Sequence, residues 1–256
     1  MLQIQNKDIR EVCDSALNMV YPRRCPVCDE IISPFEFRNG RFIVNSLIHP
    51  ACSRKIKRIT GATCLKCGKK LLPSEKDNEY CRDCRKIRHF FVKGFSLFEY
   101  RSVAGSIYRF KYLGRQEYAD FYAKEAAGKY GRKLKNMGVD AIIPVPMYGP
   151  KEKQRGYNQA QVLAERISLE TSIPVYKNVI KRCKNTLPMK KLDARGRRSN
   201  LKKAFIITRN DVKFNCILII DDIYTTGSTI DEIAHEFLMA GVKEIYFLTL
   251  AIGQTS

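Results

Sequence analysis

A stretch near the carboxyl end of the chain, residues 217–229, constrains its fold more than any other part of the sequence. It reads Ile-Leu-Ile-Ile-Asp-Asp-Ile-Tyr-Thr-Thr-Gly-Ser-Thr. The first four residues have the length and apolar character of a strand that is buried on both faces. Two carboxylates, Asp221 and Asp222, come where that strand should end. The residues that follow Gly227 have the spacing of an amphipathic helix.

The turn between this strand and this helix is suited to holding a phosphate. A helix start offers unpaired backbone N–H groups and the positive end of the helix dipole. Hydroxyl groups lie close by, and a glycine lets the backbone approach a ligand. The residues concerned are Thr225, Thr226, Gly227, Ser228 and Thr229. Because the acidic pair suits the vicinal hydroxyls of a sugar, the stretch predicts a binding site for ribose 5-phosphate. The alternative is an ordinary strand and helix joined by a polar turn.

Eight potential metal ligands lie between residues 25 and 84, in four knuckles, each with two residues between its two ligands. This spacing lets both side chains of a knuckle reach one tetrahedral ion. The ligands are Cys25, Cys28, His49, Cys52, Cys64, Cys67, Cys81 and Cys84. They predict two zinc ions. A disulfide framework is the competing interpretation, which the expected intracellular location disfavours.

The pairing of the four knuckles is open at this stage. Sequential pairing would give two stacked ribbons, and alternating pairing would give a cross-brace; we favour the sequential arrangement. His49 fills the slot that a cysteine fills in the other three knuckles. Either way each set is already four-coordinate, which leaves no open position for water or substrate, so we expect a structural role.

The chain is basic throughout, with a formal net charge of +20 over 256 residues. Residues 1–92 carry 18 Lys and Arg against 10 Asp and Glu, and residues 93–256 carry 28 against 16. Such a field favours polyanions, of which nucleic acid is the commonest, although a solvated basic surface is the alternative. The sequence shows neither a signal peptide nor an apolar run long enough to span a membrane, so we expect a cytoplasmic protein.

Strands and helices alternate from about residue 93. Helical patterns occupy 115–135 and the segment after Asn158, and strand patterns occupy 141–147, 175–180 and 244–252. This order predicts an α/β fold with a parallel, doubly wound sheet, helices on both faces and ligands at the carboxyl ends of the strands. We therefore expect two domains, a zinc-binding segment over 1–92 and the α/β domain over 93–256.

The stretch 217–229 closely resembles the phosphoribosyl-pyrophosphate (PRPP) motif of type I phosphoribosyltransferases. The chain as a whole resembles the ComF (competence protein F) family, in which a double zinc ribbon precedes such a domain and which is associated with uptake of transforming DNA. The matching pieces are the knuckles, Tyr100, Lys111-Tyr112, Gly114, Pro144-Val-Pro146, Arg155-Gly-Tyr-Asn-Gln159, Arg182, Thr186, Arg195, Arg198, Asn200, Ala204-Phe205 and Asp221–Thr229.

The resemblance implies roles for these residues. The acidic pair would hold the ribose hydroxyls, the loop 225–229 would hold the 5′-phosphate, and Mg²⁺ would accompany PRPP. Candidates for the pyrophosphate and the mobile loop are Arg155, Gly156, Asn158, Gln159, Arg195 and Arg198. The last two lie in the stretch 181–203, which holds ten Lys and Arg and one acid, Asp193.

Three positions depart from related patterns. His49 replaces a cysteine, and Met189 stands where the family usually has glutamine. Thr225 occupies a loop position that is acidic in purine transferases.

Taken as a whole, the resemblance implies a DNA-uptake protein that binds PRPP, zinc and single-stranded DNA, with the DNA-uptake machinery as a further partner. The alternative is an active transferase that acts on an unidentified acceptor, and the sequence does not decide whether catalysis is retained.

Aromatic residues among basic ones suggest where single-stranded DNA would bind. Phe35, Phe37 and Phe42 lie near Arg38 and Arg41. A second group, Phe90 and Phe91, lies beside Arg88 and Lys93. Bases can stack on such rings while Lys and Arg neutralise phosphates. The alternative is that these rings form the small core of the zinc-binding region.

Overall fold

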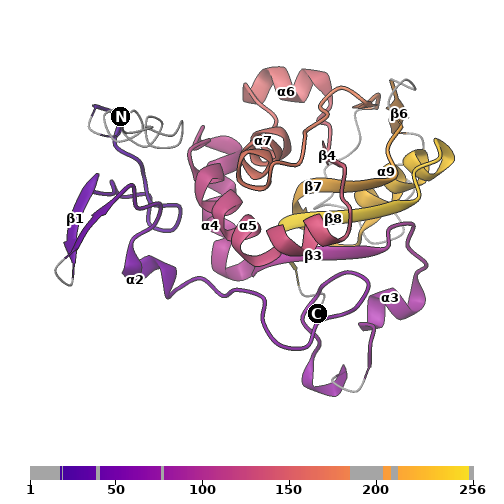
Figure 1. Ribbon diagram of the computed structural model, residues 1–256, viewed down its shortest axis with the longest axis horizontal. Helices are drawn as coiled ribbons and strands as arrows, with labels where there is room; N and C mark the ends of the chain where they lie inside the picture. The colour runs from indigo at the N-terminus through magenta and orange to yellow at the C-terminus, as the bar shows by residue number, and fades with distance from the viewer. Residues whose placement is uncertain are drawn as a thin grey trace, which may run out of the picture.

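The centre of the molecule is a four-stranded parallel sheet, which Figure 1 shows with helices packed around it. The computed structural model describes residues 18, 20–38, 41–75, 78–184, 204–208 and 213–253. The strand order is β3-β8-β7-β4, with bounds Lys93–Glu99 (β3), Glu244–Ile252 (β8), Cys216–Tyr224 (β7) and Ala141–Pro144 (β4). The predicted α/β class with a parallel sheet is confirmed, and the strand predicted over 244–252 has the predicted bounds.

Strand β7 continues past the point where the sequence predicted its end. Its pairing with β8 runs on through Asp221 and as far as Tyr224, which lies opposite Ile252. On the other side, β4 ends at Pro144, opposite Ile220. The acidic pair therefore lies within the strand, one residue beyond the end of β4, because the longer neighbour β8 still supplies hydrogen bonds there.

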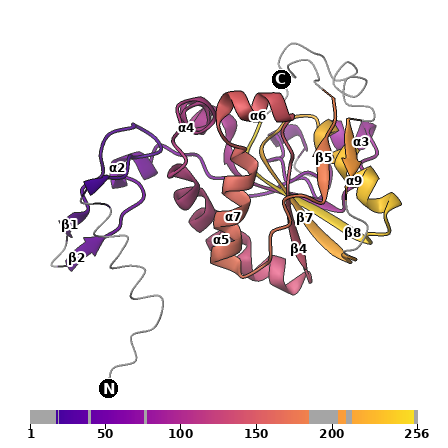
Figure 2. The same ribbon diagram turned by 90° about the horizontal axis from the view of Figure 1, so that it is seen from above.

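Helices cover both faces of the sheet, as Figure 2 shows from above. On one face, Leu218 and Ile220 pack with α4 (Tyr100–Tyr112), α5 (Tyr118–Asn136) and α7 (Gln159–Thr171). On the other, Ile217 and Ile219 pack with α9 (Ser228–Met239). Alternate residues of one buried strand thus supply two different cores, as the two-residue period of a strand requires.

The strand predicted over 175–180 is wrong. Val175 forms a single parallel bridge with Ile142, whose N–H donates to the Pro174 carbonyl. The next residue of β4 that faces this side is Pro144, which has no N–H to donate, so the ladder stops. The chain instead forms a short antiparallel pair, β5 (Ile180–Arg182) with β6 (Phe205–Ile207).

The amino-terminal part contains small elements. A two-stranded antiparallel sheet is followed by short helices, namely β1 (Phe35–Arg38), β2 (Arg41–Val44), α2 (Pro50–Ser53), η1 (Pro73–Glu75) and α3 (Arg82–Lys86). In Figure 1 the β1-β2 pair stands to one side of the large sheet, whereas α3 lies beneath it. Helix α6 (Gly149–Arg155) follows β4.

The segment 57–68 covers the outer edge of β3. The Ile59 N–H donates to the Leu97 carbonyl at 2.9 Å, and the Gly94 N–H donates to the Lys66 carbonyl at 2.7 Å. Gly68 permits this approach, because a Cβ there would lie 2.6 Å from the Gly94 oxygen; Gly94 in turn makes room for the Phe247 ring of β8, which would lie 2.0 Å from a Cβ. The edge strand is thereby paired rather than open. The domain boundary between residues 92 and 93 remains a prediction.

None of the helices in the described parts of the chain combines the length and apolar composition that crossing a bilayer requires.

Candidate functional site

The first four zinc ligands gather in one place. The ligand atoms of Cys25, Cys28, His49 and Cys52 all lie within 4.8 Å of one another. His49 Nδ1 lies 3.4 Å from the Cys28 sulfur, and its Nε2 lies 3.2 Å from the Ile31 carbonyl oxygen. An N–H at Nε2 that donates to this carbonyl would leave the Nδ1 lone pair for a metal, which is the usual arrangement of a ligating histidine.

The second four ligands form an equivalent but more deeply buried group. The sulfurs of Cys64, Cys67, Cys81 and Cys84 also lie within 4.8 Å of one another, and the first three residues are at most 1% exposed. The ligands are therefore grouped in sequential pairs, not as a cross-brace. Two sets of four thiolate or imidazole donors at this separation fit tetrahedral zinc.

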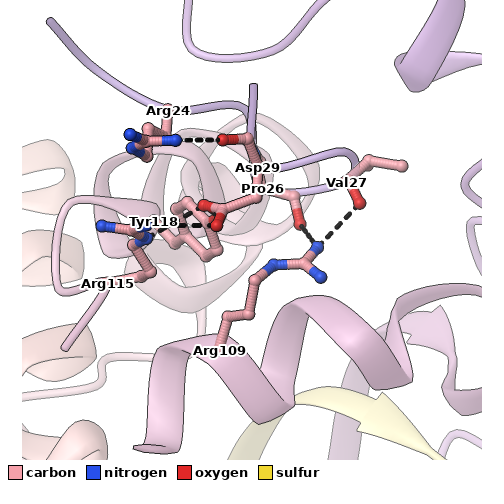
Figure 3. Close-up of polar contacts among 7 residues, drawn as sticks. All are labelled: Arg24, Pro26, Val27, Asp29, Arg109, Arg115 and Tyr118. Atoms are coloured by element: carbon pink, nitrogen blue, oxygen red, sulfur yellow. Dashed lines mark hydrogen bonds and ion pairs between the residues drawn. The ribbon is translucent and has the colours of Figure 1, made fainter. Parts of the chain in front are cut away.

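Polar contacts hold the first knuckle against helices α4 and α5, as Figure 3 shows. Arg109 of α4 donates to the carbonyls of Pro26 (3.1 Å) and Val27 (2.7 Å). Asp29, which follows the knuckle with a φ of 64°, accepts from Arg115 at 2.9 and 3.1 Å and from the Tyr118 hydroxyl at 2.5 Å. Although burial alone would raise it, these donors hold the pKa of Asp29 below its usual value.

The acidic pair in β7 sits in a polar network. Asp222 is 6% exposed, forms an ion pair with Lys111 of α4, and accepts from the Gln159 amide at 3.1 Å. Burial and the neighbouring charge of Asp222 raise the pKa of Asp221 to about 7. Burial lowers the pKa of Lys111, but the Asp222 carboxylate outweighs this, and the pKa lies above its usual value. Lys111 of helix α4 thus places a positive charge beside the acidic pair of strand β7.

The loop after the acidic pair has the geometry of a helix start. Gly227 precedes α9 with a φ of 80°, and a Cβ there would lie 2.6 Å from the Tyr224 hydroxyl. The Thr226 and Ser228 hydroxyl oxygens are 2.9 Å apart. One small hollow is lined by Asp221, Ile223, Tyr224, Thr225, Thr226, Gly227, Ser228, Thr229 and Ile230. A carboxylate, hydroxyls and the backbone of a helix start thus share one surface, which can hold a sugar phosphate.

Residues 155–159 connect α6 to α7 and reach this site through Gln159, whose amide donates to Asp222. Arg155 donates to Gln159 at 2.5 Å, and its guanidinium lies 4.7 Å from the centre of the Tyr112 ring. Gly156 ends α6 in a left-handed conformation (φ 88°). Asn158 caps α7 by accepting from the Ala160 N–H at 3.0 Å, and its amide donates to the Val145 carbonyl at 3.0 Å. In this structure Asn158 therefore fixes the start of α7.

The structure thus brings together Asp221, Asp222, residues 225–229, Arg155 and Gln159. Two further predicted residues, Arg195 and Arg198, lie outside the described residues. Two interactions were not predicted. Lys111 forms an ion pair with Asp222. Burial lowers the pKa of Arg182, and the negative charge of Asp221 opposes this lowering. Lys111 and Arg182 are both among the residues that match the family, and this match was the signal that could have pointed to them. Neither residue was assigned a partner from the sequence.

The aromatic residues predicted to stack on DNA differ in their surroundings. Phe91 is 1% exposed and lies in the core, with its ring edge-on to Phe247 at 4.8 Å, so it is not available to a base. Phe35, Phe37 and Phe90 are about half exposed or more, at 48, 66 and 48%. The side chain of Phe42 lies outside the described residues.

The fold and the site define an α/β protein with two four-ligand zinc-type sites and a hollow at the start of α9. Residues 16–85 match the double zinc ribbon domain family. Competence protein F of Haemophilus influenzae is 32% identical over 222 residues, which cover 84% of this chain and 94% of that protein. This chain belongs to the competence protein F family.

Other relatives agree with this assignment. Competence protein ComFC of Bacillus subtilis is 26% identical, with 85% of this chain and 89% of that protein covered. The DNA utilization protein YhgH of Escherichia coli K12 is 27% identical, over 76% and 85%.

Among solved structures, a purine phosphoribosyltransferase from Pyrococcus horikoshii matches with a TM-score of 0.33 and 21% identity, covering 52% of this chain and 73% of that one. The hypoxanthine phosphoribosyltransferase of Trypanosoma cruzi also matches with a TM-score of 0.33, at 14% identity and over 54% and 67% of the two chains.

Proposed function

We propose that this protein acts in the uptake or use of DNA, and that it binds PRPP with Mg²⁺, two structural zinc ions and single-stranded DNA. The observation that carries PRPP binding is the hollow lined by Asp221 and the loop 225–229. The relatives are named for competence and DNA utilization, which supports the DNA role.

Each part of the site has a task in this proposal. The loop holds the 5′-phosphate through backbone N–H groups and the hydroxyls of Thr226 and Ser228. The acidic pair accepts hydrogen bonds from the ribose hydroxyls. The candidates for binding the pyrophosphate are Arg155, Gly156 and Gln159, together with Arg195 and Arg198 of the basic stretch. Mg²⁺ neutralises part of the phosphate charge when PRPP binds.

Calorimetric titration with PRPP and Mg²⁺ tests the sugar-phosphate site. The double variant Asp221→Asn, Asp222→Asn removes acceptors for the ribose hydroxyls, and we expect affinity to fall by about a hundredfold, or roughly 3 kcal/mol. The matched control is Glu236→Gln, which removes a carboxylate of α9 that does not line the hollow. Unchanged binding by the double variant would refute the proposed binding of ribose by the acidic pair.

Fluorescence anisotropy with a labelled oligonucleotide tests the DNA role. Because the chain carries a net charge of +20, affinity for single-stranded DNA should fall steeply as salt is added. The logarithm of the binding constant should fall by about 0.7 per phosphate contact for each tenfold increase in salt concentration. The absence of binding at low salt would refute this part of the proposal and leave PRPP binding standing.

A second candidate function is phosphoribosyl transfer to an unidentified acceptor. Its support is that burial raises the pKa of Asp221 to about 7, so this carboxyl can take up or release a proton near neutral pH. Pyrophosphate release from PRPP and Mg²⁺, with nucleobases or single-stranded DNA added, separates the two. Release that depends on an acceptor and on Asp221 would favour the transferase.

A further inference from the structure

The last turns of helix α4 expose two tyrosine side chains that touch each other. Tyr108 and Tyr112 are 56% and 54% exposed, and their ring centres are 5.1 Å apart with the planes inclined by 47°. They are four residues apart and so share one helix face. Val103, Ile107 and Phe110, on the other side of α4, supply its buried surface. The two rings are therefore not needed to attach α4 to the sheet.

A cation fixes one of these rings. The Arg155 guanidinium lies 4.7 Å from the centre of the Tyr112 ring, and Arg155 also donates to Gln159 at 2.5 Å. Figure 2 shows α6, which ends at Arg155, beside α4. The ring is thus held in place from a neighbouring helix while about half of its residue surface stays accessible, which lowers the entropy cost of stacking a ligand on it.

This pair of rings lies next to the acidic pair of β7. Lys111, the residue before Tyr112, forms the ion pair with Asp222. Arg155, which contacts the Tyr112 ring, donates to Gln159, and the Gln159 amide donates to the Asp222 carboxylate at 3.1 Å. The tyrosines are therefore connected to the proposed ribose-binding carboxylates in two ways, through Lys111 and through Arg155 with Gln159.

The charge of the surroundings selects the kind of ligand. Helix α4 carries Arg101, Arg109 and Lys111 and has no acidic residue, and α6 carries two lysines and Arg155 against one glutamate. Flat aromatic rings among cations suit a ligand that is planar and linked to negative charge. The net positive charge of the two helices attracts a chain of linked phosphates, whereas it offers nothing to an apolar protein surface. A nucleobase in a phosphate-linked strand satisfies both requirements.

We propose that Tyr108 and Tyr112, with Arg155, form a stacking site for a base of single-stranded DNA, beside the ribose-phosphate site. This proposal rests on the proposed DNA binding and gives it a location on α4. The surface differs from the one predicted from the sequence, where the aromatic residues chosen lay in and after the zinc ribbons.

The absence of tryptophan from the sequence allows a direct test. In the full-length variant Tyr112→Trp, the single indole should be quenched on addition of a 20-residue oligodeoxythymidine, and an abasic oligonucleotide of equal length should not quench it. The double variant Tyr108→Ala, Tyr112→Ala should bind the oligodeoxythymidine about tenfold or more weakly, while its affinity for the abasic strand stays the same. The matched control is Tyr80→Ala, which removes a 40% exposed tyrosine of the second ribbon.

The outcomes separate this inference from the proposed function. If wild-type protein binds the oligodeoxythymidine and the double alanine variant binds equally well, the stacking site is refuted and DNA binding stands. Equal quenching by abasic and base-bearing strands, or an equal loss in Tyr80→Ala, would also overturn it. If the wild type binds neither strand at low salt, both fail. Circular dichroism of each variant excludes unfolding as the cause of a loss.

Discussion

The two zinc ribbons have the same ligand spacing within each knuckle but are attached to the sheet in different ways. The first has a small apolar cluster of its own, Cys25, Ile32 and Cys52. It reaches α4 and α5 through polar contacts at Asp29 and Arg109 and through Val27, Leu47 and Ile48, which are only partly buried against the core. The thiols of the second lie in one cluster with Phe91, Phe247 and residues of α9. The first ribbon is thus a peripheral unit packed against the α/β domain, whereas the second ribbon is part of the core of that domain.

This difference matters because aromatic contacts connect the second ribbon to residues 225–229, the proposed phosphate-binding loop (the phosphate loop). The Phe91 ring meets Phe247 at 4.8 Å, and Phe247 stacks on Tyr224 at 4.8 Å. The Tyr224 hydroxyl in turn occupies the space beside Gly227. In addition, His89 lies 2.8 Å from the carboxylate of Asp231, in the first turn of α9. We therefore expect the second zinc site, and not the first, to support the geometry of the loop.

The largest effect should come from removing one buried ligand of each ribbon. Cys25 and Cys64 are both 0% exposed. Each Cys→Ser variant should lose one zinc ion by elemental analysis. Cys64→Ser should also lower the free energy of unfolding of the whole α/β unit by more than about 4 kcal/mol, because a metal-bound part of its core is lost. Cys25→Ser should leave the main thermal transition nearly unchanged, and equal destabilisation by the two variants would break the comparison.

A second test uses the neighbouring phenylalanines that follow the second ribbon. Phe91 is 1% exposed and Phe90 is 48% exposed. Phe91→Ala should cost about 3–5 kcal/mol in chemical denaturation, because it leaves a cavity between the ribbon and the sheet. The matched variant Phe90→Ala should cost less than about 1 kcal/mol. Similar losses for both would show that Phe91 does not couple the ribbon to the core.

A smaller effect is expected where the first ribbon docks. Asp29→Asn keeps the shape and tolerates the positive φ, but it removes the charge that Arg115 faces. Amide exchange in residues 23–32 should become roughly tenfold faster, with no change in the main unfolding transition.

The pH dependence of this docking follows from the lowered pKa of Asp29. A carboxyl whose pKa is lowered by folding contributes stability above its unfolded pKa, and the contribution is lost as pH falls through the folded value. The effect of Asp29→Asn should therefore be the same at pH 6 and pH 8. A difference between these two values would show that another group controls the docking.

Local signals in the sequence predicted much of the fold. The apolar runs of β7 and β8 and the cap at Asn158 depend on neighbouring residues alone, so they could be read directly. The ligand knuckles are equally local, and the phosphate loop combines a strand, a turn and a helix start in consecutive residues.

Features that depend on distant partners were not predictable. Phe90 and Phe91 are adjacent, yet distant partners such as Phe247 of β8 and Tyr224 of β7 decide which one is buried. The end of the ladder at Val175 depends on Pro144 of another strand, and the ion pair of Lys111 with Asp222 joins residues 111 positions apart. Such contacts are set by tertiary packing, to which a single sequence gives no direct access.

Hydrogen exchange in α9 tests the central claim most directly, namely that the second ribbon supports the phosphate loop and the first does not. Cys28 and Cys84 are the least buried thiols of their sets, so Cys28→Ser and Cys84→Ser form a matched pair that removes a ligand with little change in packing. With zinc loss verified in each, we expect exchange in residues 228–239 to accelerate at least about tenfold in Cys84→Ser and to stay at the wild-type rate in Cys28→Ser. Equal protection of α9 in the two variants would contradict the account.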